Sequence, residues 1–134
     1  MDETLSFLKL PQGFSANIFA KGLLNPRVIT FDPKGDVLVS ETKNGTIARL
    51  VDENKDNIAD NKFTVISGLN KPHGLDFYFG PRNKTHYLYI AETHQVNRYI
   101  YNPVTGQITN PDKSENIVNT PVDGRHFTRT IVVG

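Results

Sequence analysis

Short runs of alternating apolar and polar residues follow one another along the chain, separated by turns rich in Gly, Pro, Asn and Asp. The runs cover residues 27–31, 37–40, 46–51, 63–67, 73–79, 87–91, 96–101 and a short stretch near 117–118. A period of two, interrupted by turn signals such as Asn44-Gly45, is typical of antiparallel strands. Because no stretch has a helical period of useful length, the sequence predicts an all-β fold.

The strand pattern also repeats along the chain. Three anchors recur 46 residues apart: Gly22 with Gly68, Pro26 with Pro72, and Phe31 with Phe77. A second stretch, 37–42, returns as 88–93, and a third copy opens at 129–134. A repeat of about 40–50 residues built from short strands is typical of a β-propeller blade. The sequence therefore predicts about two blades with flanking strands, part of a propeller of about 4–8 blades.

These patterns divide the chain into parts of one incomplete β-propeller domain spanning residues 1–134. We expect a closing strand at 14–20, a first blade at 22–67, a second blade at 68–120 and the first strand of a third blade at 126–134. Two blades and one strand do not close a ring, so the sequence reads as a fragment. Its open strand edges predict self-association.

Composition narrows the classes of partner and compartment. The net charge is +1 and cysteine is absent, which gives no reason to expect nucleic-acid binding and excludes disulfides within this segment. No apolar stretch approaches the roughly 18–20 residues that span a bilayer. The acidic start, Met1–Ser6, lacks the charged and then apolar pattern of a signal peptide.

Ionisable residues recur at equivalent positions of the copies. Arg27, His73 and Arg129 stand directly before the inner strand of their copies, and Glu41 and Glu92 follow the second strand. Blade symmetry predicts that these side chains gather at one mouth of the central channel, where they suit an anionic or polyhydroxylated ligand. Arg–Glu pairs that tie neighbouring blades together are the alternative interpretation.

Two further features carry candidate chemistry. His126, between Gly124 and the third inner strand, is either a general base or a surface residue. Residues 52–60 resemble the front of a calcium loop, but they lack the glycine at position six, and Phe63 stands where a bidentate Glu belongs. A polar connection between strands is the favoured interpretation, so no metal ligand is predicted in the chain.

Four motifs in order make a family resemblance specific. They are Leu10-Pro11-Gln12-Gly13-Phe14, Gly68-Leu69-Asn70-Lys71-Pro72-His73-Gly74-Leu75, Ala91-Glu92-Thr93-His94 and His126-Phe127-Thr128-Arg129-Thr130. Together they resemble the glucose/sorbosone dehydrogenase family, and within it the sorbosone dehydrogenase-like branch. The resemblance implies a six-bladed propeller that uses pyrroloquinoline quinone (PQQ) and calcium.

The resemblance also implies roles for individual residues. His126 matches the general base that takes the proton of the sugar hydroxyl while hydride passes to the quinone. Arg27, His73 and Arg129 become candidates for cofactor contact, whereas the calcium ligands and main cationic PQQ contacts are expected outside this chain. The implied function is the N-terminal part of a sugar or aldehyde dehydrogenase, periplasmic or secreted as a full-length protein, with this chain inactive alone.

Two other functions stay open. The first is a non-catalytic propeller that binds a partner or a glycan through the same face, since propellers host many functions. The second is a calcium-dependent lactonase-type propeller, in which Glu41 and Glu92 would be metal ligands. Replacing His126 should abolish turnover in a dehydrogenase, whereas a binding module should lose only affinity.

Overall fold

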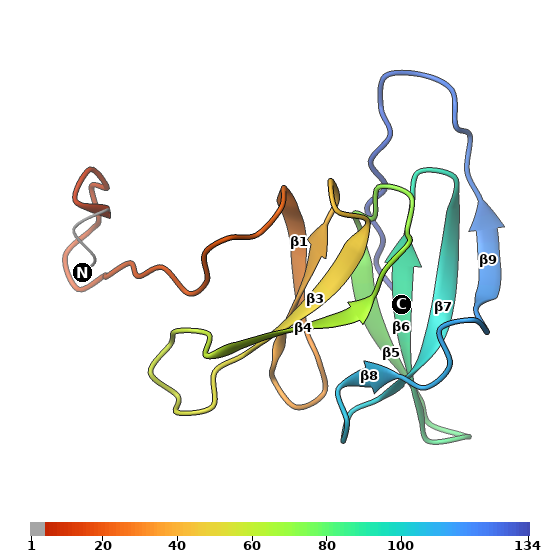
Figure 1. Cartoon of the computed structure of the whole chain (residues 1–134), viewed down its shortest axis with the longest axis horizontal. Helices are drawn as coiled ribbons and strands as arrows, with labels where there is room; N and C mark the ends of the chain where they lie inside the picture. Colours follow the sequence, from red (N-terminus) through yellow and green to blue (C-terminus); the bar gives the residue numbers. More distant parts are fainter. Residues whose placement is uncertain (1–4) are drawn as a thin grey trace.

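Nine strands form two antiparallel sheets in the computed structural model, which describes residues 5–134 (Figure 1). The strands of the first sheet, in spatial order, are β1 (Pro26–Phe31), β2 (Val37–Glu41), β3 (Thr46–Val51) and β4 (Asn61–Ile66). The second sheet holds β5 (Leu75–Gly80), β6 (Thr85–Ala91), β7 (Gln95–Asn102), β8 (Gln107–Ile108) and β9 (Glu115–Asn119). Residues 1–4 of the acidic start lie outside the described part.

Consecutive strands are neighbours throughout the first sheet and from β5 to β8 in the second, where β9 also pairs with β7. The two registers match: Val37 lies opposite Leu50 in the first sheet, as Leu88 lies opposite Tyr99 in the second. β1 lies beside β5, and β4 beside β8. This arrangement is that of two neighbouring propeller blades, and the predicted all-β, partial β-propeller fold is confirmed.

The strand predictions between residues 27 and 118 are each confirmed to within two residues. The short strand β8, at Gln107–Ile108, was not predicted because two residues carry no readable alternation. Among residues 5–134 there is no helix long and apolar enough to cross a membrane.

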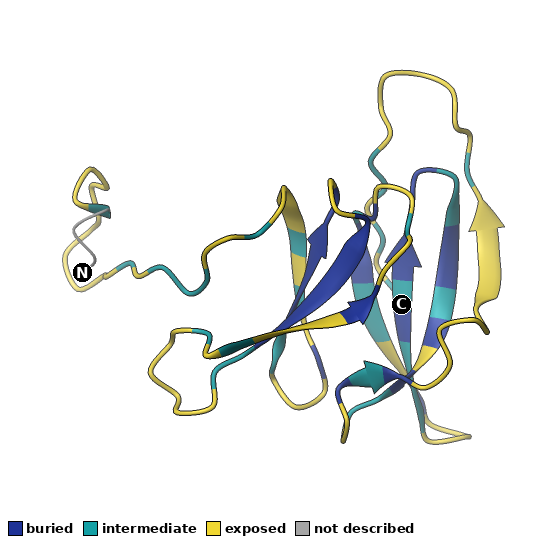
Figure 2. Ribbon diagram, in the orientation of Figure 1, coloured by how far each residue is buried: buried dark blue, intermediate teal, exposed yellow. Residues whose placement is uncertain are grey.

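The main hydrophobic core lies between the two sheets (Figure 2). The first sheet contributes Leu38, Ile47, Val65 and Ile66, and the second contributes Leu75, Leu88, Ile90, Tyr99, Tyr101 and Ile108. Alternation puts every second side chain of a strand on this face. Burial of these side chains, each contributing about 1.5–3 kcal/mol relative to exposure, joins the two sheets.

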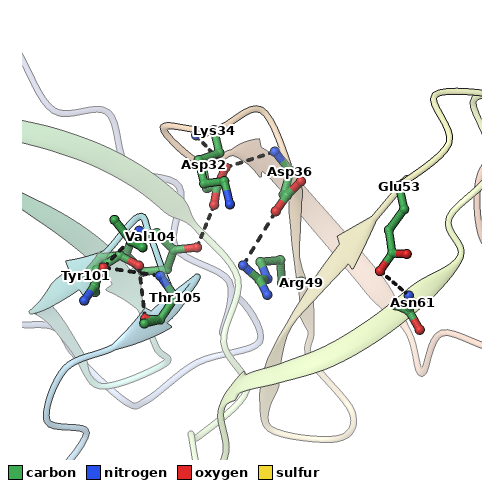
Figure 3. Close-up of polar contacts among 10 residues, drawn as sticks. Asp32, Lys34, Asp36, Arg49, Glu53, Asn61, Tyr101, Val104 and Thr105 are labelled. Atoms are coloured by element: carbon green, nitrogen blue, oxygen red, sulfur yellow. Dashed lines mark hydrogen bonds and ion pairs between the residues drawn. The ribbon is translucent and has the colours of Figure 1, made fainter.

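Polar contacts reinforce this joint (Figure 3). The buried hydroxyl of Tyr101 in β7 donates a hydrogen bond of 2.8 Å to Asp32, in the turn after β1. Burial, together with this bond to a carboxylate, raises the pKa of Tyr101 far above its ordinary value. Close by, Arg49 pairs with Asp36 at 3.6 Å and leaves no room for a side chain at position 106, which is glycine. The second sheet is thus tied to the first through one buried polar cluster.

Two predicted strands do not form. The segment 14–20 has no strand: the Phe19 carbonyl accepts one hydrogen bond, from the Ala59 N–H, and its ring packs against the outer face of the first sheet. One such bond gives no ladder, and the closing role of this segment stays a prediction. The segment 126–134 is also irregular, because within residues 5–134 it has no following strand with which to pair, as β1 pairs with β2.

The outer face of the first sheet is apolar and open. Ile29 and Phe31 are each 62% exposed, whereas Leu75, at the position of the second copy equivalent to Ile29, is 5% exposed in the core. The first sheet covers Leu75, whereas no sheet covers Ile29 in the described structure. The open face of the first sheet therefore resembles the face of the second sheet that packs against a neighbouring blade. Self-association through it stays a prediction.

Candidate functional site

The loop before the inner strand is built alike in the three copies. Each begins with a glycine of positive φ, at Gly22, Gly68 and Gly124, a conformation that other residues rarely adopt. Two residues later stand Leu24, Asn70 and His126. The candidate base therefore occupies a defined position of the repeat, and the first two copies show how that position is held.

A buried glutamate holds the loop in both complete copies. The backbone N–H of Leu24 donates to Glu41 at 2.7 Å, and the N–H of Asn70 donates to Glu92. The two carboxylates are 1% and 4% exposed. A buried carboxylate is stable only when it is hydrogen-bonded, so both glutamates are parts of the loop structure.

The two glutamates differ in their other partners. Glu41 also accepts hydrogen bonds from Lys62, at 2.9 Å, and from the Thr46 hydroxyl. Burial by itself raises the pKa of Glu41, but the hydrogen bonds from Lys62 and Leu24, with the Lys62 charge, outweigh it and leave the pKa below its ordinary value of 4.5. Glu92 instead accepts from the Gln95 amide at 2.8 Å.

His73 connects the second copy to the third. Its Nδ1 lies 3.2 Å from the Arg129 carbonyl oxygen, and the neighbouring Gly74 N–H donates to the same oxygen at 2.9 Å. Because a carbonyl only accepts, the hydrogen of the neutral ring is on Nδ1 and Nε2 keeps its lone pair. His73 thus combines a structural contact with a second nitrogen able to meet a ligand.

Arg129 holds the loop that carries His126. Its Nη1 donates to the carbonyl oxygens of His126 and Thr128, at 2.7 and 3.0 Å, and its Nη2 donates to that of Pro121 at 2.6 Å. The His126 side chain itself is exposed. Next to it, the Phe127 ring lies 4.7 Å from the Lys71 ammonium.

The fourth candidate, Arg27, lies in the first copy of the repeat. It is exposed at the second residue of β1. The neighbouring Val28 N–H donates to the Ser40 hydroxyl, which donates in turn to the His73 carbonyl at 2.8 Å. Arg27, in β1, and His73, two residues before β5, therefore stand at the same end of adjacent inner strands, and their cofactor role stays a prediction.

The residues 52–60 form a loop closed by its own side chains. Asp52 accepts from the backbone N–H groups of Asp56 and Asn57, and Asp56 accepts from that of Ile58. The oxygens that would meet a cation are used to shape the turn. In residues 5–134, no group of three or more His, Cys, Asp or Glu side chains could hold a metal ion.

Sequence reasoning missed two hydroxyl groups of this region. Ser40 bridges Val28 and His73, and the Thr42 hydroxyl donates to the Pro72 carbonyl at 2.6 Å. Both lie in the matched stretch 37–42, and position 40 pairs a serine with an alanine, Ala91, in the second copy. That difference was the available signal.

Taken together, these contacts gather His73, His126 and Arg129 into one hydrogen-bonded unit at the start of β5, with Arg27 on the adjacent inner strand. Such an edge offers cationic groups and imidazole nitrogens. Binding of an anionic or hydroxyl-rich molecule at this edge stays a prediction.

Comparison with known proteins identifies a family and solved structures that resemble this chain. The TrAA12-like family model matches residues 8–134. The PQQ domain of a pyranose dehydrogenase from Coprinopsis cinerea, in its holo form, is 25% identical, with a TM-score of 0.67 over 84% of this chain. No curated protein matches.

Two structures of a Trichoderma reesei carbohydrate-active enzyme of family AA12 are 27% identical. The iodide structure has a TM-score of 0.69 over 87% of this chain, and the calcium structure 0.67 over 85%. The chain spans 25–28% of the length of these solved relatives. The resemblance to PQQ-dependent sugar oxidoreductases is supported, whereas the narrower sorbosone branch is not.

Proposed function

The chain belongs to the TrAA12-like family, and from that premise we propose that it forms part of a PQQ-dependent sugar dehydrogenase. The observation that carries the proposal is the unit formed by His73, His126 and Arg129 at the start of β5. It lies in the part of the chain that the family model covers.

The residues present suit a quinone cofactor with carboxylate groups. Arg27 is exposed in β1, and His73 uses Nδ1 for the Arg129 carbonyl, which leaves Nε2 for a ligand. When bound, PQQ would supply the two-electron acceptor, and the protein would bind and orient it. Calcium belongs to the same proposal as a Lewis acid, but no residue of this chain is assigned to it, because residues 5–134 hold no suitable group.

His126 acts in this proposal as general base. Its imidazole would take the proton of the sugar hydroxyl, and PQQ, when bound, would supply the two-electron acceptor for oxidation of the same carbon. An imidazole suits this step because its ordinary pKa lies near neutral pH.

The test is reconstitution of the full-length protein that contains this chain. The protein without cofactor is titrated with PQQ in the presence of calcium, and oxidation of a panel of aldoses is followed with a dye as electron acceptor. We expect turnover that depends on PQQ, and none from the 134-residue chain alone. Tight PQQ binding with no sugar or aldehyde oxidised would contradict the proposal, and retention on glycans without turnover would favour the binding module.

A further inference from the structure

The Arg129 guanidinium is engaged inside its own loop. It donates three hydrogen bonds to backbone carbonyl oxygens, those of Pro121, His126 and Thr128. The three distances, 2.6 to 3.0 Å, are those of well-formed charge-assisted bonds. Residues eight, three and one positions earlier in the chain are thereby drawn around one planar cation.

The base of this arrangement is itself fixed. The Arg129 carbonyl oxygen accepts from the Gly74 N–H at 2.9 Å and lies 3.2 Å from His73 Nδ1. Two residues further, the Ile131 side chain packs close to Gly74: a Cβ atom added at position 74 would lie 3.1 Å from Ile131 Cγ1. The cation therefore extends from an anchored backbone toward an exposed loop.

Besides these bonds, the Lys71 ammonium contacts the Phe127 ring of this loop. In the complete copies, a buried glutamate of the same blade captures the N–H two residues after the glycine, at Leu24 and Asn70. For residues 121–128, the guanidinium bonds to carbonyl oxygens take that place in the described structure. The hydrogen bond to the His126 carbonyl holds the backbone of His126 in place. It thereby restricts the direction in which the imidazole side chain extends from the loop.

We propose that Arg129 is a positioning residue, which holds the His126 loop through its backbone. The catalytic consequence rests on the proposed function above, whereas the structural role does not. A guanidinium is suited to this task because its rigid fork reaches several acceptors at once, which a lysine ammonium on a flexible chain does not reproduce.

The first test uses trypsin on the full-length protein without cofactor. The bond after Arg125 lies inside the clamped loop, so its cleavage rate reports local opening. We expect Arg129→Met to speed this cleavage about tenfold or more, because charge-assisted hydrogen bonds are lost, with Arg129→Lys in between. Arg82→Met, in the exposed β5–β6 turn, is the matched control for loss of charge and should leave the rate unchanged.

The second test separates positioning from cofactor contact. In the reconstituted enzyme, Arg129→Ala should lower kcat about 10- to 100-fold while the PQQ dissociation constant changes less than about threefold. Millimolar guanidinium chloride should restore part of the lost kcat, since the ion can enter the vacated position.

The outcomes decide the two proposals independently. Faster cleavage with a lowered kcat supports the positioning role. An unchanged cleavage rate in Arg129→Met overturns it, as does a loss of PQQ affinity that accounts for the lost turnover, which would make Arg129 a cofactor ligand. Should the enzyme oxidise no sugar, the proposed function fails, and the cleavage rate still decides whether Arg129 clamps the loop.

Discussion

The junction between the first and second copies and the junction between the second copy and residues 128–134 use the same backbone positions with different chemistry. At the first junction, the Val28 N–H reaches the His73 carbonyl through the Ser40 hydroxyl, which bridges the two. At the second, the Gly74 N–H donates to the Arg129 carbonyl directly, at 2.9 Å. One contact contains a side-chain spacer and the other does not.

Two substitutions between the copies explain the difference. Val28 and Ser40 correspond to Gly74 and Ala91. A Cβ atom at position 74 would lie 2.6 Å from the Arg129 oxygen, so direct contact requires glycine, and the alanine at 91 then needs no hydroxyl. With a valine in the strand, the backbones stand farther apart and the serine hydroxyl spans the gap. Each pair is a self-consistent solution.

A second pair of positions is satisfied at one junction only. The Thr42 hydroxyl donates to the Pro72 carbonyl, whereas the equivalent Thr93 hydroxyl is buried without a hydrogen-bond partner. The carbonyl that corresponds to Pro72 is that of Thr128, which is bonded to the Arg129 guanidinium instead. The Arg129 guanidinium thus occupies the Thr128 carbonyl oxygen, which the repeat would pair with the Thr93 hydroxyl.

The largest expected effect comes from breaking the direct contact. Gly74→Val should lower the free energy of unfolding by about 2–3 kcal/mol, because the new side chain overlaps the Arg129 backbone. Urea unfolding measures this cost, and faster amide hydrogen exchange at Ile131 to Val133 should show that this irregular segment has detached from the start of β5.

Adding Ala91→Ser to this variant rebuilds the first junction at the second. The double variant should recover at least about 1 kcal/mol of the loss, since the hydroxyl can bridge the widened gap. Ala91→Ser alone is the matched control. If the change in the free energy of unfolding of the double variant equals the sum of the two single changes, positions 74 and 91 are not coupled.

Replacing the two threonines should give effects of different size. Thr42→Val leaves the buried Pro72 carbonyl without its donor and should cost about 1–3 kcal/mol. Thr93→Val removes a buried hydroxyl that has no partner, and is expected to be neutral or stabilising. Thermal unfolding of both variants tests this, and equal destabilisation would show that Thr93 is satisfied in solution.

The smallest effect is the pH dependence of the loop held by Glu41. Because the pKa of Glu41 is lowered by Lys62 and Leu24 against the effect of burial, its ionised form stabilises the fold at pH above 4.5. That contribution is lost as the pH falls from 4.5 through the lowered pKa in the folded state. Lys62→Met should reduce the acid sensitivity by less than about 1 kcal/mol, measured by urea unfolding between pH 3 and 7.

Much of the fold follows from local pattern. Alternation and turn residues predict strands such as Thr46–Val51, because a half-buried strand needs that pattern wherever it stands. The repeat adds the equivalence of the loops at Gly22, Gly68 and Gly124, which the structure shows as shared positive φ angles. The segment 14–20 shows the limit: its alternation is real, but a strand also needs a partner.

The site could be predicted only in outline. The repeat aligns Arg27, His73 and Arg129, yet it cannot say that an arginine side chain turns back onto its own loop. Nor does it reveal that Glu41 and Glu92 accept hydrogen bonds from backbone N–H groups. A glutamate at the channel mouth and a glutamate that holds a loop look the same in the sequence. Hydrogen-bond direction depends on packing, which no periodicity encodes.

The central claim is that the position held by Leu24 and Asn70 in two copies carries chemistry in the third. The most direct measurement compares His126→Gln with Asn70→Leu, which installs the residue of the first copy, in the PQQ-reconstituted full-length enzyme. We predict that His126→Gln lowers kcat about 10²- to 10⁴-fold with PQQ still bound, while Asn70→Leu lowers it less than about tenfold. Equal losses, or a His126→Gln enzyme with normal kcat, would contradict the claim.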